Sequence, residues 1–118
     1  MNKKRIYIAG PMRGIEDYNY PAFIYASDEF MKYPELRDAW EVVNPVEIGE
    51  GFGSAGELAD DPKLLKRLME LELAAVKSCD AILLLRGWEK SEGARGELRV
   101  AIDNQLEIYT QESGVLIR

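Results

Sequence analysis

The sequence contains no histidine and only one cysteine, Cys79. Without imidazole the chain has no Ser-His-Asp or Cys-His nucleophile system and no histidine-ligated zinc. A single thiol forms neither an internal disulfide nor a thiolate cage for a metal. Carboxylates, arginines, tyrosines and the backbone are left for chemistry, so we expect an activity that uses no metal and no cofactor.

Long apolar runs and an excess of basic charge are also missing. The longest apolar run is Ala81-Ile82-Leu83-Leu84-Leu85, too short for a membrane span, and too few apolar residues follow Lys3-Lys4-Arg5 for a signal peptide. The formal charge of −6 argues against a duplex nucleic-acid partner. We expect a cytoplasmic protein with no nucleic-acid or membrane partner, and 118 residues suit one domain over residues 1–118.

Apolar runs alternate with segments of helical periodicity along the chain. Strands are expected at residues 5–9, 40–44, 80–85, 106–110 and 115–117, and helices at 20–33, from Asp60 or Asp61 to Lys77, and at 92–103. The glycine-rich residues 49–60 are expected to form a loop. This alternation predicts an α/β fold: a single-domain open sandwich with a mostly parallel five-stranded sheet, flavodoxin- or Rossmann-like.

Such folds bind ligands at the carboxyl ends of their strands. The segments that follow those ends are Gly10–Tyr20, Asn44–Asp61 and Arg86–Glu97. Within the second of them, residues 51–56 fit the pattern G-x-G-x-x-G, but they lie too far from both the strand and the helix for a dinucleotide-binding turn. We interpret residues 51–56 as part of a lid or rim loop.

Glu72 falls on the apolar stripe of a predicted helix, which also holds Leu65, Leu68, Met69 and Val76. An unpaired carboxylate on a core-facing stripe is driven towards its neutral form. Two readings are open. In the first, Glu72 forms a salt bridge, or the helix is rotated by one residue from the predicted phase so that Glu72 points away from the core. Alternatively, it lines a cleft as a tuned acid or base, or binds a hydroxyl group.

Glu97 lies early in the next predicted helix, after the small residues Gly93, Ala94 and Gly96. Glycines let a ligand approach the backbone, and a helix N-terminus offers free N–H groups to an anion. The alternative reading makes Glu97 a surface acid that the helix dipole favours.

Arg13 follows the first strand and Arg95 opens the third predicted helix. Two arginines at one sheet edge suit a phosphate or carboxylate, although each alone is more often a solvated surface residue. Tyr18 and Trp88 are the aromatic candidates for contact with a base or sugar, and the sequence does not separate that role from packing. The candidate substrate- or phosphate-binding residues are Gly10, Pro11, Arg13, Gly14, Ser91, Gly93, Ala94 and Arg95.

Read together, these residues resemble the nucleoside 2-deoxyribosyltransferase superfamily, including its deoxynucleoside 5′-monophosphate N-glycosidase branch. The stretches that carry the likeness are residues 6–14, 72–80 and 87–98. The order Gly87-Trp88, Ser91 and Gly93-Ala94 is typical of a small branch found in bacteria and their phages.

The resemblance implies a role for each matching residue. Glu97 matches the family nucleophile, Glu72 stands where relatives have an aspartate, and Tyr7 matches a tyrosine that orients the nucleophile. Arg13 and Ser91 match positions that grip a 5′-phosphate. Three departures favour a nucleotide over a free nucleoside: Glu72 itself, Arg99 where relatives have a glycine, and Ser91 in place of an aspartate of the transferases.

The resemblance therefore implies an enzyme that cleaves or exchanges the N-glycosidic bond of a (deoxy)nucleoside or its 5′-monophosphate. A covalent glycosyl ester on Glu97 would be resolved by water or a second base. It also implies a homo-oligomer with a small-molecule nucleoside or nucleotide as its partner. The alternatives are a non-catalytic nucleotide or sugar-phosphate binding module on the same fold, and a scaffold protein in which Glu72 and Glu97 open onto different faces.

Overall fold

The computed structural model of the chain describes residues 3–50, 61–112 and 115–117. Its sheet has the strand order β2-β1-β3-β4-β5. The strands are β1 (Lys4–Ala9), β2 (Trp40–Val43), β3 (Ala81–Leu84), β4 (Glu107–Glu112) and β5 (Val115–Ile117). β2, β1, β3 and β4 run parallel, and β5 is antiparallel to β4 at one edge. β1 therefore lies inside the sheet, between β2 and β3.

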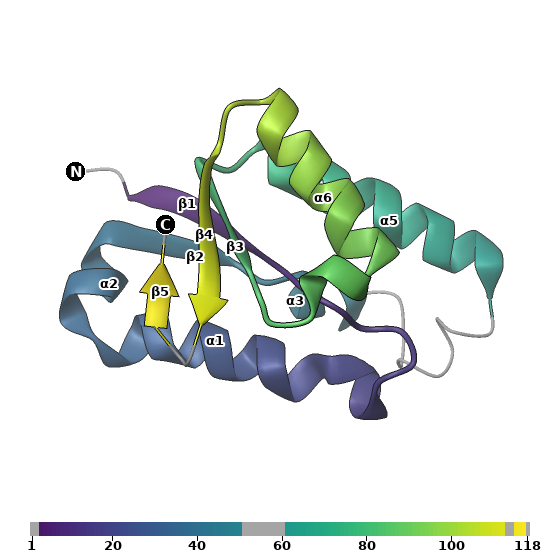
Figure 1. Cartoon of the computed structure of the whole chain (residues 1–118), viewed down its shortest axis with the longest axis horizontal. Helices are drawn as coiled ribbons and strands as arrows, with labels where there is room; N and C mark the ends of the chain where they lie inside the picture. The colour runs from purple at the N-terminus through teal and green to yellow at the C-terminus, as the bar shows by residue number, and fades with distance from the viewer. Residues whose placement is uncertain (1–2, 51–60, 113–114, 118) are drawn as a thin grey trace.

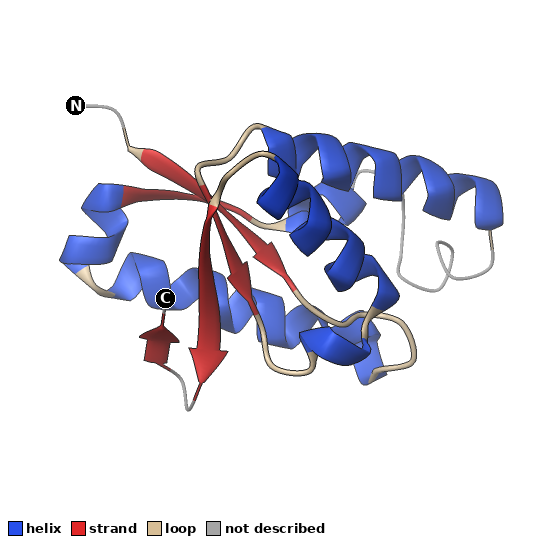
Figure 2. Ribbon diagram, turned by 45° about the horizontal axis from the view of Figure 1, so that its top comes forward, coloured by secondary structure: helices blue, strands red, loops and turns tan. Residues whose placement is uncertain are grey.

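Helices cover both faces of this sheet (Figures 1 and 2). They are η1 (Glu16–Asn19), α1 (Tyr20–Lys32), α2 (Pro34–Ala39), α3 (Pro45–Glu50), α5 (Pro62–Lys77), η2 (Trp88–Lys90) and α6 (Glu92–Asp103). α1 packs on one face, and α5 and α6 lie side by side on the other. The expected α/β fold with an open, mostly parallel sheet is confirmed.

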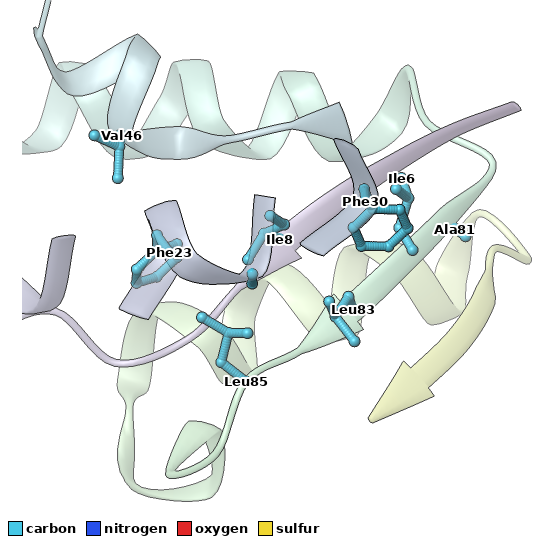
Figure 3. Packing of buried hydrophobic residues seen from close by; sticks show 9 residues of the cluster. Ile6, Ile8, Phe23, Phe30, Val46, Ala81, Leu83 and Leu85 are labelled. Atoms are coloured by element: carbon cyan, nitrogen blue, oxygen red, sulfur yellow. The ribbon is translucent and has the colours of Figure 1, made fainter. Parts of the chain in front are cut away.

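The two faces of β1 belong to two different core layers, because successive strand residues point to opposite sides of a sheet. Ile6 and Ile8 pack with Phe23 and Phe30 of α1, in the layer drawn in Figure 3. Tyr7 and Ala9 face the other way and pack in the layer formed with α5 and α6. All four β1 residues are fully buried. Tyr7 is thus directed at the same two helices that carry Glu72 and Glu97.

Four short helical segments were not expected from the sequence: η1, α2, α3 and η2. α2 begins at Pro34, the residue that follows the helix expected over 20–33, because proline is also favoured in the first turn of a helix. α3 likewise begins at Pro45 and includes Gly49 and Glu50, so the expected loop over 49–60 is wrong at its start. The remaining part of that loop and the pattern at residues 51–56 lie outside the described residues.

Among the helices within residues 3–50 and 61–112, none is long and apolar enough to cross a membrane.

Candidate active site

A cavity of about 370 Å³ opens beside the ends of β1 and β3. Its walls come from the loop after β1, from α5, and from the N-terminal half of α6. The lining residues are Gly10, Pro11, Met12, Arg13, Tyr18, Phe23, Pro45, Leu65, Leu68, Met69, Glu72, Leu73, Lys90, Ser91, Glu92, Gly93, Ala94, Gly96 and Glu97. The cavity therefore occupies the sheet edge at which open α/β folds bind ligands.

The loop after β1 begins with a close backbone approach at Gly10. A Cβ atom built on Gly10 would lie 2.9 Å from the Cβ of Leu85, which follows β3. Glycine is needed there because any side chain would push the ends of β1 and β3 apart. This contact brings the loop that carries Pro11, Met12 and Arg13 to the cavity mouth.

α5 supplies the apolar wall. Asp61 caps this helix by accepting hydrogen bonds from the N–H groups of Lys63 and Leu64. The predicted stripe of α5 divides along its length: Leu65, Leu68, Met69 and Glu72 face the cavity, whereas Val76 is buried in the core layer below. Glu72 is therefore an acid on a wall that is otherwise apolar.

The pKa of Glu72 is raised to about 7 because the cavity wall excludes water from its carboxylate, and the nearby charge of Arg13 lowers it only in part. Within the described part of the chain, no salt bridge involves Glu72. The reading of Glu72 as a cleft-lining acid therefore fits better than the salt-bridged alternative.

α6 presents Glu97 to the cavity floor. Ser91 caps this helix through its Oγ, which accepts from the N–H of Ala94 at 3.1 Å. Ala94, Glu97 and Ala101 form the buried stripe of the helix, and Glu97 is only 8% exposed. The reading of Glu97 as a surface acid is wrong, because the stripe that it shares with two alanines is turned towards the sheet.

Tyr7 of β1 reaches Glu97 across the second core layer. Its hydroxyl donates a hydrogen bond to Oε2 of Glu97. Burial and the neighbouring carboxyls of Glu97 and Glu72 raise the pKa of Tyr7 well above its usual value, so the phenol keeps its proton and acts as a donor. The bond fixes the orientation of the Glu97 carboxyl at the base of the cavity.

Glu97 is buried and Glu72 is half-buried, and the charge of Glu72 acts on the carboxyl of Glu97. The pKa of Glu97 is raised well above its usual value by burial first and by the charge of Glu72 second, whereas the hydrogen bond from Tyr7 opposes this rise. Two neighbouring acids in a poorly hydrated site do not both ionise readily. The pair therefore favours a state with one proton between the two acids, in which one acid can donate while the other acts as a carboxylate.

The cationic groups of the cavity are Arg13 and Lys90. Nη2 of Arg13 lies 3.6 Å from Sδ of Met69, so this side chain bridges the loop after β1 and α5. Arg95, which we expected beside Arg13, is exposed and does not line the cavity. Glu97 lies two residues after Arg95 on the same helix, and two residues of an α-helix are separated by about 200° around the helix axis. Because Glu97 faces the sheet, Arg95 is directed away from the site.

A left-handed turn leads into α1 at the cavity edge. Asp17, Tyr18 and Asn19 all have positive φ, at 54°, 55° and 58°. Each non-glycine residue in this conformation costs on the order of 1 kcal/mol, although Asp and Asn tolerate it better than Tyr. Tyr18 lines the cavity, and its ring meets that of Tyr20 edge to face, with centroids 5.9 Å apart.

Most of the residues predicted for the site lie together at this cavity. Those that line it are Glu97, Glu72, Gly10, Pro11, Arg13, Ser91, Gly93, Ala94 and Tyr18, and Tyr7 lies below Glu97. Gly14, Trp88 and Arg95 do not line it. Gly14 is exposed in the loop after β1, and Trp88 packs against the core layer of Tyr7. Glu72 and Glu97 open onto the same cavity, which contradicts the arrangement expected of a scaffold protein.

Several residues that line the cavity were not predicted from the sequence to belong to the site. They are Met12, Phe23, Pro45, Leu65, Leu68, Met69, Leu73, Lys90, Glu92 and Gly96. The α5 residues among them already shared a helical stripe with Glu72, and that stripe was a usable signal. No comparable pattern marked Lys90 or Pro45, because their places depend on how the short helices η2 and α3 lie at the sheet edge.

No group of three or more Cys, Asp or Glu side chains within residues 3–50 and 61–112 is arranged to hold a metal ion.

A model of the family described as "Domain of unknown function (DUF4406)" matches residues 4–110 of the chain. The match spans most of the sequence and includes β1, α5 and α6, so the chain belongs to this family. No curated protein matches the chain.

Proposed function

We propose that the protein cleaves or exchanges the N-glycosidic bond of a (deoxy)nucleoside or its 5′-monophosphate, with Glu97 as the nucleophile. The observation that carries this proposal is the buried Glu97 carboxyl, bonded to the Tyr7 hydroxyl and sharing one cavity with Glu72. The resemblance of residues 6–14, 72–80 and 87–98 to the nucleoside 2-deoxyribosyltransferase superfamily supports the same reaction.

The reaction begins with attack of a Glu97 carboxylate oxygen on the anomeric carbon of the sugar. A carbon–oxygen bond forms, the bond from the sugar to the base nitrogen breaks, and its electron pair leaves with the base. The developing positive charge on the sugar is favoured by a neighbouring carboxylate in a site shielded from water. Tyr7 acts as a positioning residue, since its hydroxyl holds Glu97 and does not line the cavity.

Glu72 is the group suited to donate a proton to the leaving base. Its pKa of about 7 keeps much of it protonated near neutral pH, which is the form a general acid needs. After the base departs, ionised Glu72 takes a proton from water, whose oxygen attacks the sugar ester and releases Glu97. If a second base attacks in place of water, the same steps in reverse give base exchange.

A 5′-phosphate has suitable partners at the cavity mouth. Arg13 and Lys90 are cationic, and the N-terminus of α6 presents backbone N–H groups beside Ser91 and Gly93. Oγ of Ser91 already accepts the capping hydrogen bond from the N–H of Ala94. Its hydroxyl proton therefore remains free to be donated to a phosphate oxygen. These groups support a monophosphate more than a free nucleoside.

The raised pKa of Glu97 favours a second candidate function, a binding module that does not turn its ligand over. A neutral carboxyl is a poor nucleophile, and burial raises the pKa of Glu97 and so favours its neutral form in the free site. Under the first proposal, substrate binding must shift the proton from Glu97 to Glu72 or to solvent. Under the second, the neutral acid donates a hydrogen bond to a sugar hydroxyl and no bond breaks.

The deciding experiment incubates the protein with a panel of deoxynucleosides and their 5′-monophosphates and measures released base by chromatography. The enzyme proposal expects base release, its loss in Glu97→Gln, and its retention in the control Glu89→Gln, which changes an exposed acid of η2. Intact-protein mass spectrometry after acid quenching should find the sugar on the wild type and on Glu89→Gln but not on Glu97→Gln. Tight binding by calorimetry without base release would favour the binding module, and no binding would contradict both.

A further inference from the structure

The turn before α1 contains an asparagine whose side chain does not serve its helix. Asn19 is the N-cap residue of α1, a position at which an asparagine side chain commonly accepts a helix N–H. Its side chain makes no such capping bond. Instead Nδ2 of Asn19 donates to the backbone carbonyl of Pro11 at 2.7 Å.

This bond joins two parts of the cavity wall. Pro11 lines the cavity from the loop after β1, and Tyr18, next to Asn19, lines it from the left-handed turn. The turn has other bonds of its own: the N–H of Tyr18 donates to the carbonyl of Ile15 at 3.0 Å, and the N–H of Tyr20 donates to the carbonyl of Asp17. Among the described hydrogen bonds, the one from Asn19 is the side-chain link between this turn and the Pro11 loop.

The backbone conformation of Tyr18 is unfavourable and needs other contacts to hold it. A tyrosine with φ of 55° is in a sparsely populated region, and left-handed residues usually occur singly. Here three successive residues adopt it, ending at Asn19. Strained backbone persists only where the surrounding structure holds it, and it is frequent at ligand-binding sites. The side chain of Tyr18 is an aromatic ring at the wall of the cavity.

We propose that Asn19 is a positioning residue, which ties the left-handed turn to Pro11 and so holds the Tyr18 ring as the surface on which the base of the ligand stacks. This inference rests on the proposed function, because it assumes a ligand that carries a planar base. The half-buried ring of Tyr18 also packs edge to face on Tyr20, which leaves its orientation fixed on that side. Stacking on an aromatic ring accepts any base, so this wall selects for planarity rather than for a hydrogen-bonding edge.

The first test concerns the turn and needs no ligand. Asn19→Asp keeps the size and tolerance of positive φ but loses the donor to Pro11, and Asn19→Gly tolerates the same φ without adding charge. We expect faster amide hydrogen exchange, measured by NMR, at Tyr18 and Tyr20 in both variants. Asp17→Gly relieves strain in the same turn without touching the link, and it should leave exchange at Tyr18 unchanged. Wild-type exchange in both Asn19 variants would overturn the positioning role.

The second test concerns the ligand. All proteins carry Glu97→Gln to prevent turnover, and calorimetry compares deoxyadenosine with 2-deoxyribose 5-phosphate, which has no base. We expect Asn19→Gly and Tyr18→Leu to weaken deoxyadenosine binding at least about fivefold and Tyr18→Phe to retain it, because the ring supplies the stacking. Binding of 2-deoxyribose 5-phosphate should be unchanged in all three.

Two further outcomes separate the inference from the function on which it rests. Faster exchange in the Asn19 variants together with unchanged deoxyadenosine binding would overturn the stacking role while leaving the proposed function intact. If neither ligand binds to the Glu97→Gln protein or to the wild type, the proposed function and the stacking role both fail. The exchange measurements would then still decide whether Asn19 holds the turn.

Discussion

The hydroxyl of Tyr7, in the middle of the sheet, donates a hydrogen bond to the carboxyl of Glu97 on α6. This bond lowers the pKa of Glu97, while burial and Glu72 raise it more strongly. It is the contact in the site that favours ionised Glu97, the form required of a nucleophile.

Tyr7→Phe is expected to reduce base release and to shift its pH dependence. A hydrogen bond to a charged group is worth about 1.5–3 kcal/mol, which corresponds to a roughly tenfold to hundredfold slower reaction. Because the lost bond lowered the pKa of Glu97, the rising limb of the pH–rate profile should move to higher pH. Tyr25→Phe, on the exposed face of α1, is the control. An unshifted limb would contradict the assigned role of Tyr7.

Glu72→Gln is expected to stabilise the protein at alkaline pH and to leave it unchanged at acid pH. The folded-state pKa of about 7 exceeds the ordinary 4.5, so the folded protein binds this proton more tightly than the unfolded chain. Stability is therefore lost as pH rises between these values, by up to about 3 kcal/mol. Urea unfolding at pH 4 and pH 8 measures the difference. Glu70→Gln, on the exposed side of α5, should show no such pH-dependent gain.

Ser91→Asp should separate the cap of α6 from a contact with phosphate. Aspartate retains an acceptor for the N–H of Ala94, so the free energy of unfolding should stay close to that of the wild type, whereas Ser91→Ala should lower it by about 1 kcal/mol. The added charge should weaken binding of a deoxynucleoside 5′-monophosphate but not of the matching deoxynucleoside. Equal binding of both ligands by Ser91→Asp would argue against a phosphate beside Ser91.

Gly10→Ala should destabilise the fold. The new methyl group would lie 2.9 Å from the Cβ of Leu85, and neither backbone can move without disturbing the pairing of β1 and β3. Overpacking of this kind costs about 1–3 kcal/mol. Chemical denaturation measures the loss, with Gly96→Ala as the control, because a Cβ there meets no atom within 4 Å. Equal losses in the two variants would show that the contact with Leu85 is not the cause.

The sheet and its long helices could be predicted because their signals are local. The apolar run that contains β3 and the stripe of α5 depend on spacing alone, and Asp61, one of the two aspartates expected to begin the helix, is its cap. The helix at Pro34 was missed since one proline can follow one helix and open the next.

The site was predictable where a helical stripe or the family resemblance pointed at it, as for Glu72 and Glu97. The left-handed turn at Asp17, Tyr18 and Asn19 was not, because it depends on the bond from Asn19 to the carbonyl of Pro11, eight residues earlier. Lys90 lines the cavity and Arg95 does not, and only the position of Arg95 could have been predicted from the sequence. A helical projection turns Arg95 away from Glu97, but only the fold of η2 brings Lys90 to the cavity.

Tyr7 contributes both to the core and to the candidate site. Its fully buried ring fills the core layer under α5 and α6, and its hydroxyl donates a hydrogen bond to Glu97. Replacement by another apolar residue could preserve the packing only by giving up the bond, and a smaller polar residue could not fill the space. Under the proposed function, a substitution of Tyr7 therefore changes folding and activity together. A directed-evolution search for hardier variants should keep this position fixed and draw its diversity from the exposed faces of α1 and α2.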